Sequence, residues 1–313
     1  MASHLAKSSI AIAVGLGAYF ALFGQSYASA VSMKVAGGAP ECPWRRLFGM
    51  PVDAQRFVEI REAIAKQMSV IDSDASLDIQ LIKTAGRPFW IRKGGNDMGG
   101  QRLLAYLIGE QEWVGESDPG ATVRKGDWVI DVGAHVGVFT DRALRLGAEK
   151  VFMVEPDPIN VECLRRNFSK EIASGRVILI AEGAWSKKGS MDLNTGVANS
   201  GTGSMMYKEA GSKTVSVPVR PIDDMVAEFK APRIDFIKMD IEGAEREALK
   251  GAAGTLKRWR PRMALDSYHL PDDAVVLPQV IFAANADYRT TCGPCELNTN
   301  HGKRISPHVT FYR

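Results

Sequence analysis

The stretch 128-WVIDVGAHVGVFT-140 decides the fold, because it joins a strand, a glycine-rich turn and a helix. An apolar run ends at Asp131, Gly133 and Gly137 permit a tight turn, and a helix is predicted from about Phe139. Glycines at the carboxyl end of a sheet strand let the backbone approach a ligand closely. The spacing D-x-G-x-x-x-G differs from the dinucleotide pattern G-x-G-x-x-G. A carboxylate two residues before the first glycine disfavours a phosphate there and favours a ligand that carries an ammonium group.

Outward from this stretch, short apolar strands alternate with helical segments from residue 122 onward. This pattern predicts a parallel sheet with helices on both faces. The interval from Met191 to Val219 has alternating polarity and glycine-rich turns, which predict an added hairpin. The strand candidates are Trp128–Val132, Lys150–Val154, Arg176–Ala181, Ile234–Met239 and Met263–Asp266; the helical ones are Thr140–Leu146, Asn160–Phe168 and Ala244–Trp259.

Acidic residues end the second and third of these strands. Glu155 follows Asp131 by 24 residues, near the distance at which an acidic strand end accepts both hydroxyls of a ribose. Glu182, beside Gly183, is a candidate edge for an adenine ring. With the ammonium preference, this set argues against a nicotinamide dinucleotide and favours S-adenosylmethionine as the cofactor.

The fourth strand reads 234-IDFIKMDIEGAE-245 and supplies the candidate reactive groups. Asp240 is predicted at the mouth of the same cleft, and Glu242 follows at the start of a helix, where it also complements the helix dipole. His269 ends the next strand and is either a general base or an ordinary polar residue at a strand end. Two carboxylates are too few for a metal site, so no metal is predicted.

At this point the sequence resembles the FkbM-like family of S-adenosylmethionine-dependent methyltransferases. The resemblance covers residues 88–313 and depends mainly on the glycine-rich turn occurring together with the IKMDIEGAE block. The matching segments are VIDVGAHVGVFT, VEPDP, IAEGAWS, DFIKMDIEGAEREALKGA and RPRMALDSYH. It implies a class I methyltransferase fold, Rossmann-like, with a mostly parallel seven-stranded sheet and helices on both faces.

The resemblance also implies an activity and a set of site residues. The activity is O-methylation of a hydroxyl on a sugar, glycolipid or other small acceptor, in line with the departing sulfonium. The alternative is a catalytically inactive methyltransferase-like scaffold subunit of a membrane assembly. Carried over by position, the methionine part of the cofactor falls to Asp131, Gly133, Ala134, His135 and Gly137, its ribose to Glu155, and the transfer site to Asp240 and Glu242. His135 stands where a small amide residue is common in the family.

Residues 1–33 differ from the rest of the chain. The run Ile10–Phe23 is apolar or small, no charge occurs between Lys7 and Lys34, and Ala28-Ser29-Ala30 follows. These features predict a signal peptide or an uncleaved membrane anchor, with membrane association through residues 8–33. The predicted division is therefore 1–33 as signal peptide or anchor, 34–120 as linker and N-terminal extension, and 121–313 as the methyltransferase domain.

Within the extension, residues 37–51 read as a Gly/Pro-rich linker and 53–68 as an amphipathic helix. A polar gap follows, then strand candidates at Leu77–Lys83 and Pro88–Arg92. Residues 101–114 form another predicted amphipathic helix.

Composition narrows the function. With 39 Lys and Arg against 36 Asp and Glu in 313 residues, the chain has no electrostatic signature of nucleic-acid binding.

Because S-adenosylmethionine is made in the cytosol, the predicted export conflicts with the predicted methyltransferase activity. An anchor that leaves the catalytic domain in the cytosol, or an organelle that imports the cofactor, resolves the conflict.

The four cysteines are too few for a disulfide-stapled fold. Cys292-Gly-Pro-Cys295 has a redox-type spacing, but no apolar helix follows it, so a turn or a local disulfide is expected. Cys163 is predicted to be buried in a helix. Cys42 lies in the linker and pairs only in an oxidising compartment.

Overall fold

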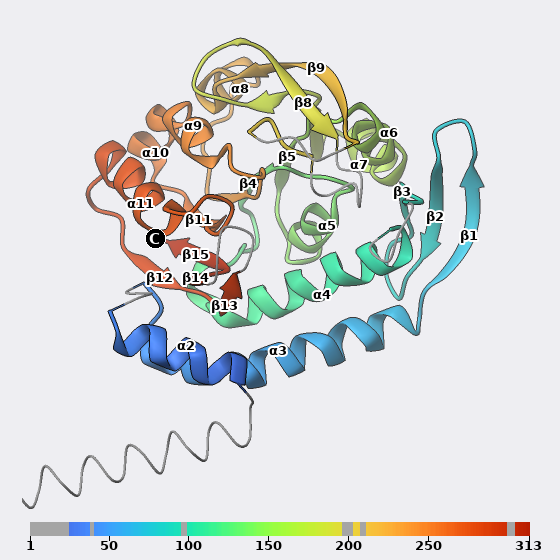
Figure 1. The fold of residues 1–313 in the computed structure, drawn as a ribbon. Helices are drawn as coiled ribbons and strands as arrows, with labels where there is room; N and C mark the ends of the chain where they lie inside the picture. Colours follow the sequence, from blue (N-terminus) through green and yellow to red (C-terminus); the bar gives the residue numbers. More distant parts are fainter. Residues whose placement is uncertain (1–24, 38–40, 95–98, 196–202, 207–210, 299–303) are drawn as a thin grey trace, which may run out of the picture.

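The computed structural model describes residues 25–37, 41–94, 99–195, 203–206, 211–298 and 304–313, and a seven-stranded sheet forms its centre (Figure 1). The strand order is β12-β15-β11-β10-β4-β5-β6, and the five strands from β11 to β6 run parallel. β15 runs antiparallel to both β11 and β12. The strands are β4 (Trp128–Val132), β5 (Lys150–Val154), β6 (Val177–Ile180), β10 (Phe236–Met239), β11 (Arg262–Asp266), β12 (Thr290–Cys292) and β15 (Val309–Tyr312). The predicted mostly parallel α/β sheet is confirmed.

Each face of this sheet is buried under helices. Along β4, Val129 packs into the core on one face, whereas Ile130 and Val132 pack into the core on the other. α4, α5 and α6 contribute to the first core, and α8 to α11 contribute to the second. The helices are α4 (Gln101–Ser117), α5 (Val138–Arg145), α6 (Pro158–Asn167), α7 (Ser169–Ala173), α8 (Ile222–Glu228), α9 (Glu245–Lys250), α10 (Ala253–Trp259) and α11 (Asp273–Ala284).

The predicted single helix over Ala244–Trp259 is divided into α9 and α10. The break lies at Gly251, whose Cα packs so tightly against the carbonyl oxygen of Trp185 that a Cβ would collide with it.

The N-terminal extension shares the first core with the sheet. α3 (Trp44–Ala65) packs on α4, and β1 (Ser69–Asp74), β2 (Ile79–Lys83) and β3 (Phe89–Arg92) form an antiparallel sheet beside it. Ile79 and Phe89 lie in the same buried cluster as residues of the central sheet. β1 falls in the predicted polar gap: this edge strand pairs with β2 while its side chains are mostly exposed, so it has no apolar pattern.

The predicted linker over residues 37–51 is wrong for its second half. α3 begins at Trp44, directly after Pro43, and runs through Pro51. Leu47 and Met50 are buried against the C-terminal hairpin formed by β13 (Cys295–Asn298) and β14 (Arg304–Pro307). Tertiary burial therefore makes this Gly/Pro-containing segment helical.

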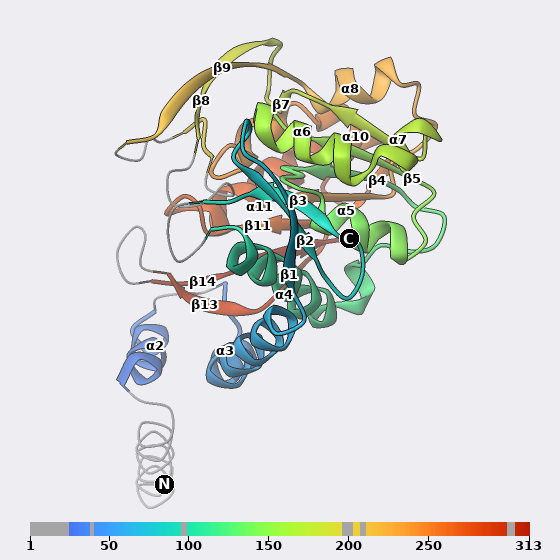
Figure 2. The same ribbon diagram turned by 90° about the vertical axis from the view of Figure 1, so that its right-hand side faces the viewer.

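α2 (Gln25–Val35) lies beside α3 and against β14 (Figures 1 and 2). Ala30 and Val31 of this helix are buried in the cluster around the C-terminal hairpin. Most of the predicted signal peptide or anchor falls in residues 1–24, outside the described residues. Across the residues that the structure describes, none of the helices combines the length and apolarity needed to cross a bilayer.

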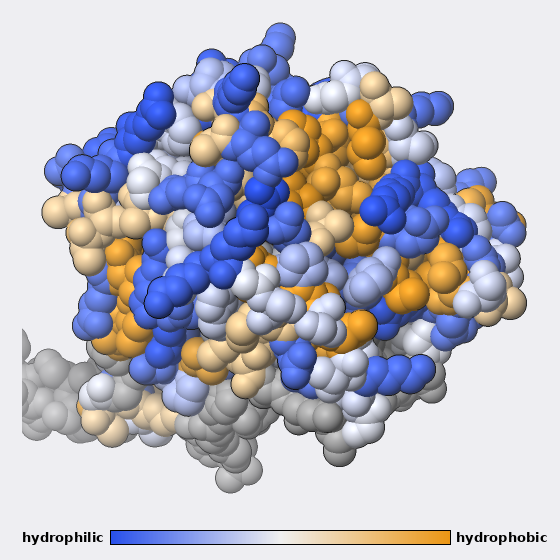
Figure 3. Space-filling view, turned by 90° about the horizontal axis from the view of Figure 1, so that it is seen from above, coloured by the Kyte–Doolittle hydropathy of each residue, from blue (hydrophilic) through white to orange (hydrophobic). Residues whose placement is uncertain are grey.

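The predicted hairpin between residues 191 and 219 is confirmed. β8 (Gly189–Thr195) pairs antiparallel with β9 (Lys213–Arg220), which also pairs with the short β7 (Gly183–Ala184). This small sheet lies at the top of the molecule in Figure 1. Viewed from above, a band of hydrophilic residues crosses the surface, and apolar residues are visible on both sides of it (Figure 3).

Candidate functional site

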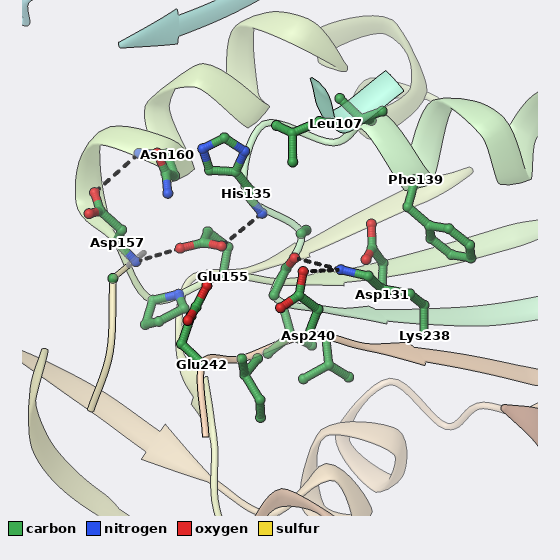
Figure 4. Close-up of a pocket in the computed structure, with 18 of the residues that line it drawn as sticks. Leu107, Asp131, His135, Phe139, Glu155, Asp157, Asn160, Lys238, Asp240 and Glu242 are labelled. Carbon is green, nitrogen blue, oxygen red and sulfur yellow. Dashed lines mark hydrogen bonds and ion pairs between the residues drawn. The ribbon is translucent and has the colours of Figure 1, made fainter. Parts of the chain in front are cut away.

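A cavity of about 320 Å³ opens at the carboxyl ends of β4, β5 and β10. α4 forms one wall, and residues of the β8–β9 region, among them Leu193 and Met205, form another. Open α/β sheets bind their ligands at this edge. Figure 4 shows the labelled side chains converging on the cavity from the strand ends and from α4 to α6. Of the predicted site residues, the lining includes Asp131, Gly133, Ala134, His135, Glu155, Asp240 and Glu242.

Two glycines of the turn after β4 are required by close packing. A Cβ on Gly133 would collide with the carbonyl oxygen of Asp240, and one on Gly137 would collide with the ring of Phe168. Both glycines have positive φ, at 79° and 91°, a conformation that L side chains rarely adopt. Gly133 thus brings the turn against the end of β10, so that Asp131 and Asp240 share one cavity. Gly137 precedes α5 and does not itself line the cavity.

Asp131 is completely buried at the end of β4. Its Oδ2 accepts a hydrogen bond from the Thr140 hydroxyl at 2.7 Å, and its Oδ1 has no hydrogen-bond partner among the described residues. Burial raises the pKa of Asp131, although nearby Lys238 opposes the shift. A cationic group in the cavity would interact with the unsatisfied lone pairs of Oδ1 and offset the cost of burying a charged carboxylate.

Glu155 lies at the end of β5 and is fixed by backbone amides. His135 N–H donates to its Oε2 at 2.8 Å, and Asp157 N–H donates to its Oε1 at 2.9 Å. Burial, with help from Asp157, raises the pKa of Glu155 to about 8. Each oxygen keeps a lone pair. At this pKa Glu155 is mostly protonated in the empty cavity at neutral pH, and the hydroxyl donors of a ligand would favour its carboxylate form.

His135 lines the cavity with a left-handed backbone, at φ 51°. Burial lowers the pKa of His135 to about 3, and Arg92 and Lys238 add to the shift. The imidazole is therefore neutral and unsuited to hold an anionic ligand.

Asp157 and Asn160 also line the cavity, and the sequence analysis missed them. Asp157 caps α6 by accepting from the Ile159 amide at 2.8 Å, and it forms an ion pair with Arg92 at 2.5 Å. The available signal was the Asp-Pro pair at residues 157–158, which is typical of a helix start.

The floor of the cavity carries an ion pair. Lys238 Nζ lies 3.4 Å from Asp240 Oδ2 and 3.4 Å from the Gly133 carbonyl oxygen (Figure 4). Burial opposes the charge on Asp240, but Lys238 and His269 outweigh it and lower the pKa of Asp240. Asp240 is therefore an ionised carboxylate at neutral pH.

His269 lies behind the carboxylates rather than in the cavity lining. Its Nδ1 is 2.9 Å from Glu245 Oε1, and its Nε2 is 3.5 Å from Asp240 Oδ1 and 3.7 Å from Glu242 Oε2. Burial opposes protonation, yet Glu245 and Glu242 raise the pKa of His269 well above 6.5. The structure thus favours a protonated, positioning His269. Glu245, for which the sequence analysis gave no site role, is completely buried as the partner of His269.

Asp240, Asp266 and His269 offer ligand atoms within 4.8 Å of one another. Burial and the nearby Asp240 raise the pKa of Asp266 well above its usual range. The absence of a metal, expected from the sequence, stays a prediction.

The described end of the β8–β9 insertion lies over the part of the cavity next to Glu242. The Ser204 hydroxyl donates to the backbone oxygen of Glu242 at 2.8 Å, which ties the insertion to the turn after β10. Glu242 itself has φ 53°, followed by Gly243 at 98°. From the other side, Tyr106 and Glu110 of α4 enter the lining. The extension therefore contributes to the site, which no motif in its sequence indicated.

Two predicted features lie elsewhere. Glu182 does not line the cavity, because its carboxylate pairs with Arg220 at 3.0 Å. Of the two alternatives expected for Cys292 and Cys295, a turn or a local disulfide, the disulfide is wrong: Cys295 pairs with Cys42, and Cys292 is not disulfide-bonded. α3 brings Cys42 to the hairpin across 253 residues of sequence, a proximity that residue spacing does not reveal.

Comparison with known proteins gives one family match over the site. The family model described as "Methyltransferase FkbM domain" matches residues 131–290, just over half of the chain. Methyltransferase sdnD of Sordaria araneosa is 26% identical over 161 residues, which cover 42% of this chain and 62% of the relative. Hexuronic acid methyltransferase AglP of Haloferax volcanii is 28% identical over 160 residues, covering 51% and 59%. The chain thus spans about three fifths of the length of these two curated relatives.

Among solved structures, methyltransferase FkbM from Methylobacillus flagellatus aligns with a TM-score of 0.44 at 20% identity. The alignment covers 86% of this chain and 62% of that one.

Proposed function

This chain belongs to the FkbM methyltransferase domain family, and we propose that it transfers a methyl group from S-adenosylmethionine to a hydroxyl of a neutral, hydroxylated small acceptor such as a sugar or glycolipid. The observation that carries the proposal is the single cavity in which Asp131 and Glu155 lie beside Asp240. The first pair fits the cofactor, and Asp240 fits the acceptor.

S-adenosylmethionine is the cofactor of this family, and the residues of the cavity fit it. Asp131 presents a buried carboxylate oxygen without a partner among the described residues, which suits the ammonium group. Glu155 is held by two backbone amides in an orientation that leaves it able to accept ribose hydroxyls. When bound, the cofactor supplies an electrophilic methyl group on a sulfonium.

Asp240 is the group placed to receive the proton of the acceptor hydroxyl. It lines the cavity, and Lys238 and His269 keep it ionised. Asp240 Oδ would accept the proton that the acceptor hydroxyl gives up when it is methylated. Because a carboxylate with a lowered pKa is a weak base, orienting the acceptor oxygen supplies more of the rate than proton abstraction.

The charge of the lining favours a neutral acceptor. Lys238 is the one cation among the described residues that line the cavity, since His135 is neutral. Even with Glu155 protonated, five other carboxyl groups line it: Glu110, Asp131, Asp157, Asp240 and Glu242. An acceptor with its own carboxylate would meet this excess of negative charge. One relative acts on hexuronic acid, so a sugar acceptor is supported, but we infer its uncharged form here.

Calorimetric titration of the full chain with S-adenosylmethionine tests the cofactor site. We expect binding that Asp131→Asn and Glu155→Gln each weaken by about tenfold or more, because each removes a charge-assisted contact. Glu182→Gln is the matched control, since its side chain pairs with Arg220 outside the cavity. If the folded wild type does not bind S-adenosylmethionine, the alternative of a catalytically inactive scaffold subunit is favoured. An equal loss of binding in Glu182→Gln would contradict the assignment of Asp131 and Glu155 to the cofactor.

Methyl transfer to paired acceptors, followed by mass spectrometry, tests the acceptor class. A neutral glycoside should accept methyl groups faster than the corresponding uronate, and the opposite order would contradict the charge argument.

Asp240→Asn should lower kcat by roughly 10²-fold while cofactor binding stays unchanged. A chelator should leave the rate unchanged. Loss of activity that Mg²⁺ restores would instead assign Asp240, Asp266 and His269 to a cation.

A further inference from the structure

The first half of α3 exposes a row of large apolar side chains. Trp44, Phe48 and Val52 are 44%, 47% and 59% exposed. They follow one another every fourth residue, so they share one face of the helix. Leu47 and Met50, on a different face, are buried against the C-terminal hairpin. We call Trp44, Phe48 and Val52 the α3 stripe.

Cations border this stripe. Arg45 and Arg56 are exposed, and the helical period places both on the same flank of the stripe, Arg45 next to Trp44 and Arg56 one turn beyond Val52. Lys34, at the end of α2, holds its ammonium 6.0 Å from the centre of the Trp44 ring. The Trp44 and Phe48 rings stack with their centres 5.7 Å apart. Glu59 is an acidic residue further along the same side of α3.

The combination is specific to this surface among the described residues. The exposed large apolar side chains of α11, Val275 and Phe282, take part in no stacked ring pair among the described residues. Single exposed apolar residues are ordinary on protein surfaces. A contiguous row with an aromatic pair and a basic flank is typical of helices that lie in a membrane interface.

The sequence indicates which partner covers this face. Residues 8–33 carry no charge, and Ile10–Phe23 is apolar or small throughout. This run continues directly into α2, which lies beside α3 at one side of the molecule in both views (Figures 1 and 2). The most apolar stretch of the sequence therefore comes directly before α2, the helix that lies beside α3.

We propose that α2 and α3 lie on an anionic membrane surface, with the α3 stripe in the headgroup region and Lys34, Arg45 and Arg56 facing anionic lipid. Tryptophan prefers this depth, and basic side chains are attracted by the surface charge. The proposal is independent of the acceptor, because none of these residues lines the cavity.

Fluorescence quenching by brominated lipids tests the position of Trp44. None of the six tryptophans precedes Trp44, so residues 10–23 give no signal of their own. With the full chain and vesicles of phosphatidylcholine and phosphatidylglycerol, Trp44→Phe should remove most of the quenching. Trp259→Phe, a half-buried tryptophan on α10, should leave it unchanged.

Paired charge reversal tests the basic flank. Arg45→Glu with Arg56→Glu should weaken binding to the phosphatidylglycerol vesicles by about tenfold or more, and have little effect on neutral vesicles. Lys257→Glu with Arg258→Glu makes the same charge change on exposed positions of α10 and should weaken it much less. Thermal melting confirms that each variant is folded.

Two results would overturn the proposal. Vesicle binding without quenching of Trp44 would mean that the N-terminal residues bind the bilayer while α3 stays clear of it. Conversion of a lipid-free dimer to monomer by Trp44→Ser with Phe48→Ser, seen by sedimentation, would assign the stripe to a second copy of the chain. The variant Val275→Ser with Phe282→Ser is the matched control for that measurement.

Discussion

At the scale of single residues, Gly133 links the fold to the site. Its missing side chain lets the turn after β4 touch the Asp240 carbonyl, and that contact brings together the groups proposed for the cofactor and for the acceptor. Both the positive φ angle and the close contact exclude a side chain, so a substitution would cost stability through backbone strain and, separately, through steric clash.

Gly133→Ala should lower the free energy of unfolding by about 2–4 kcal/mol, from backbone strain and steric clash together. Gly126→Ala is the matched control: φ is 87° there, but a Cβ would meet no atom within 4 Å, so about 1 kcal/mol is expected. Denaturant unfolding measures both. Equal losses would show that the clash is absent.

His269 should act on the reaction through Asp240. Because its positive charge lowers the pKa of Asp240, His269→Gln should raise that pKa and move the acid limb of kcat/KM to higher pH. Glu245→Gln should shift the limb in the same direction by less, since it weakens only the support of the imidazolium.

The pH profile of each variant is the measurement. A uniform drop at every pH, without movement of the limb, would mean that His269 has a purely structural role.

At the scale of elements, the disulfide between Cys42 and Cys295 joins the start of α3 to the C-terminal hairpin. A third sulfur lies close by, because Cys292 Sγ is 3.4 Å from Cys295 Sγ. Burial raises the pKa of the Cys292 thiol to about 11, so little thiolate is present at neutral pH and exchange is expected to be slow.

Cys42→Ser should cost roughly 2–4 kcal/mol of unfolding free energy and should allow Cys292 to pair with Cys295 under air oxidation. Peptide mapping by mass spectrometry without reduction detects the new pair. Cys163→Ser, at the free buried cysteine, should give no change in disulfide pattern. Free thiols at both Cys292 and Cys295 in oxidised Cys42→Ser would contradict this expectation.

At the scale of the whole molecule, a buried network joins α4 to the C-terminal hairpin. His308 Nε2 lies 3.0 Å from Glu110 of α4, and His308 Nδ1 lies 3.2 Å from Glu296 of the C-terminal hairpin. Burial opposes protonation, but Glu296 and Glu110 raise the pKa of His308 well above 6.5. The imidazolium therefore helps to hold α4, a wall of the cavity, against the hairpin.

This network predicts a pH dependence of stability. A raised folded-state pKa gives stability that is fully present below about pH 6.5 and is lost as the pH rises through the folded value. The free energy of unfolding should fall across that alkaline range, and His308→Gln should flatten the fall. The pKa of His269 is raised as well, so His269→Gln should also flatten the fall, and the double variant should flatten it further. An unchanged slope in His308→Gln would contradict a charged His308.

The sequence alone determined the parallel sheet, the glycine turn and the acidic residues at the strand ends that line the cavity. Strand ends in an α/β sheet meet at one edge, so Asp131, Glu155 and Asp240 could be placed together from their positions alone. These features can be predicted locally, because each depends on a motif of about a dozen residues and on the rule that the carboxyl ends of parallel strands meet at one edge of the sheet.

Only the tertiary structure decided the rest, since those features depend on contacts between distant segments. Helix α3 forms where Gly and Pro predicted a linker, because Leu47 and Met50 are buried on the hairpin. Glu182 leaves the cavity for Arg220, while Glu245 becomes the support of His269. Burial, ion pairing and the disulfide partner are properties of the packed molecule, and no local pattern in the chain encodes them.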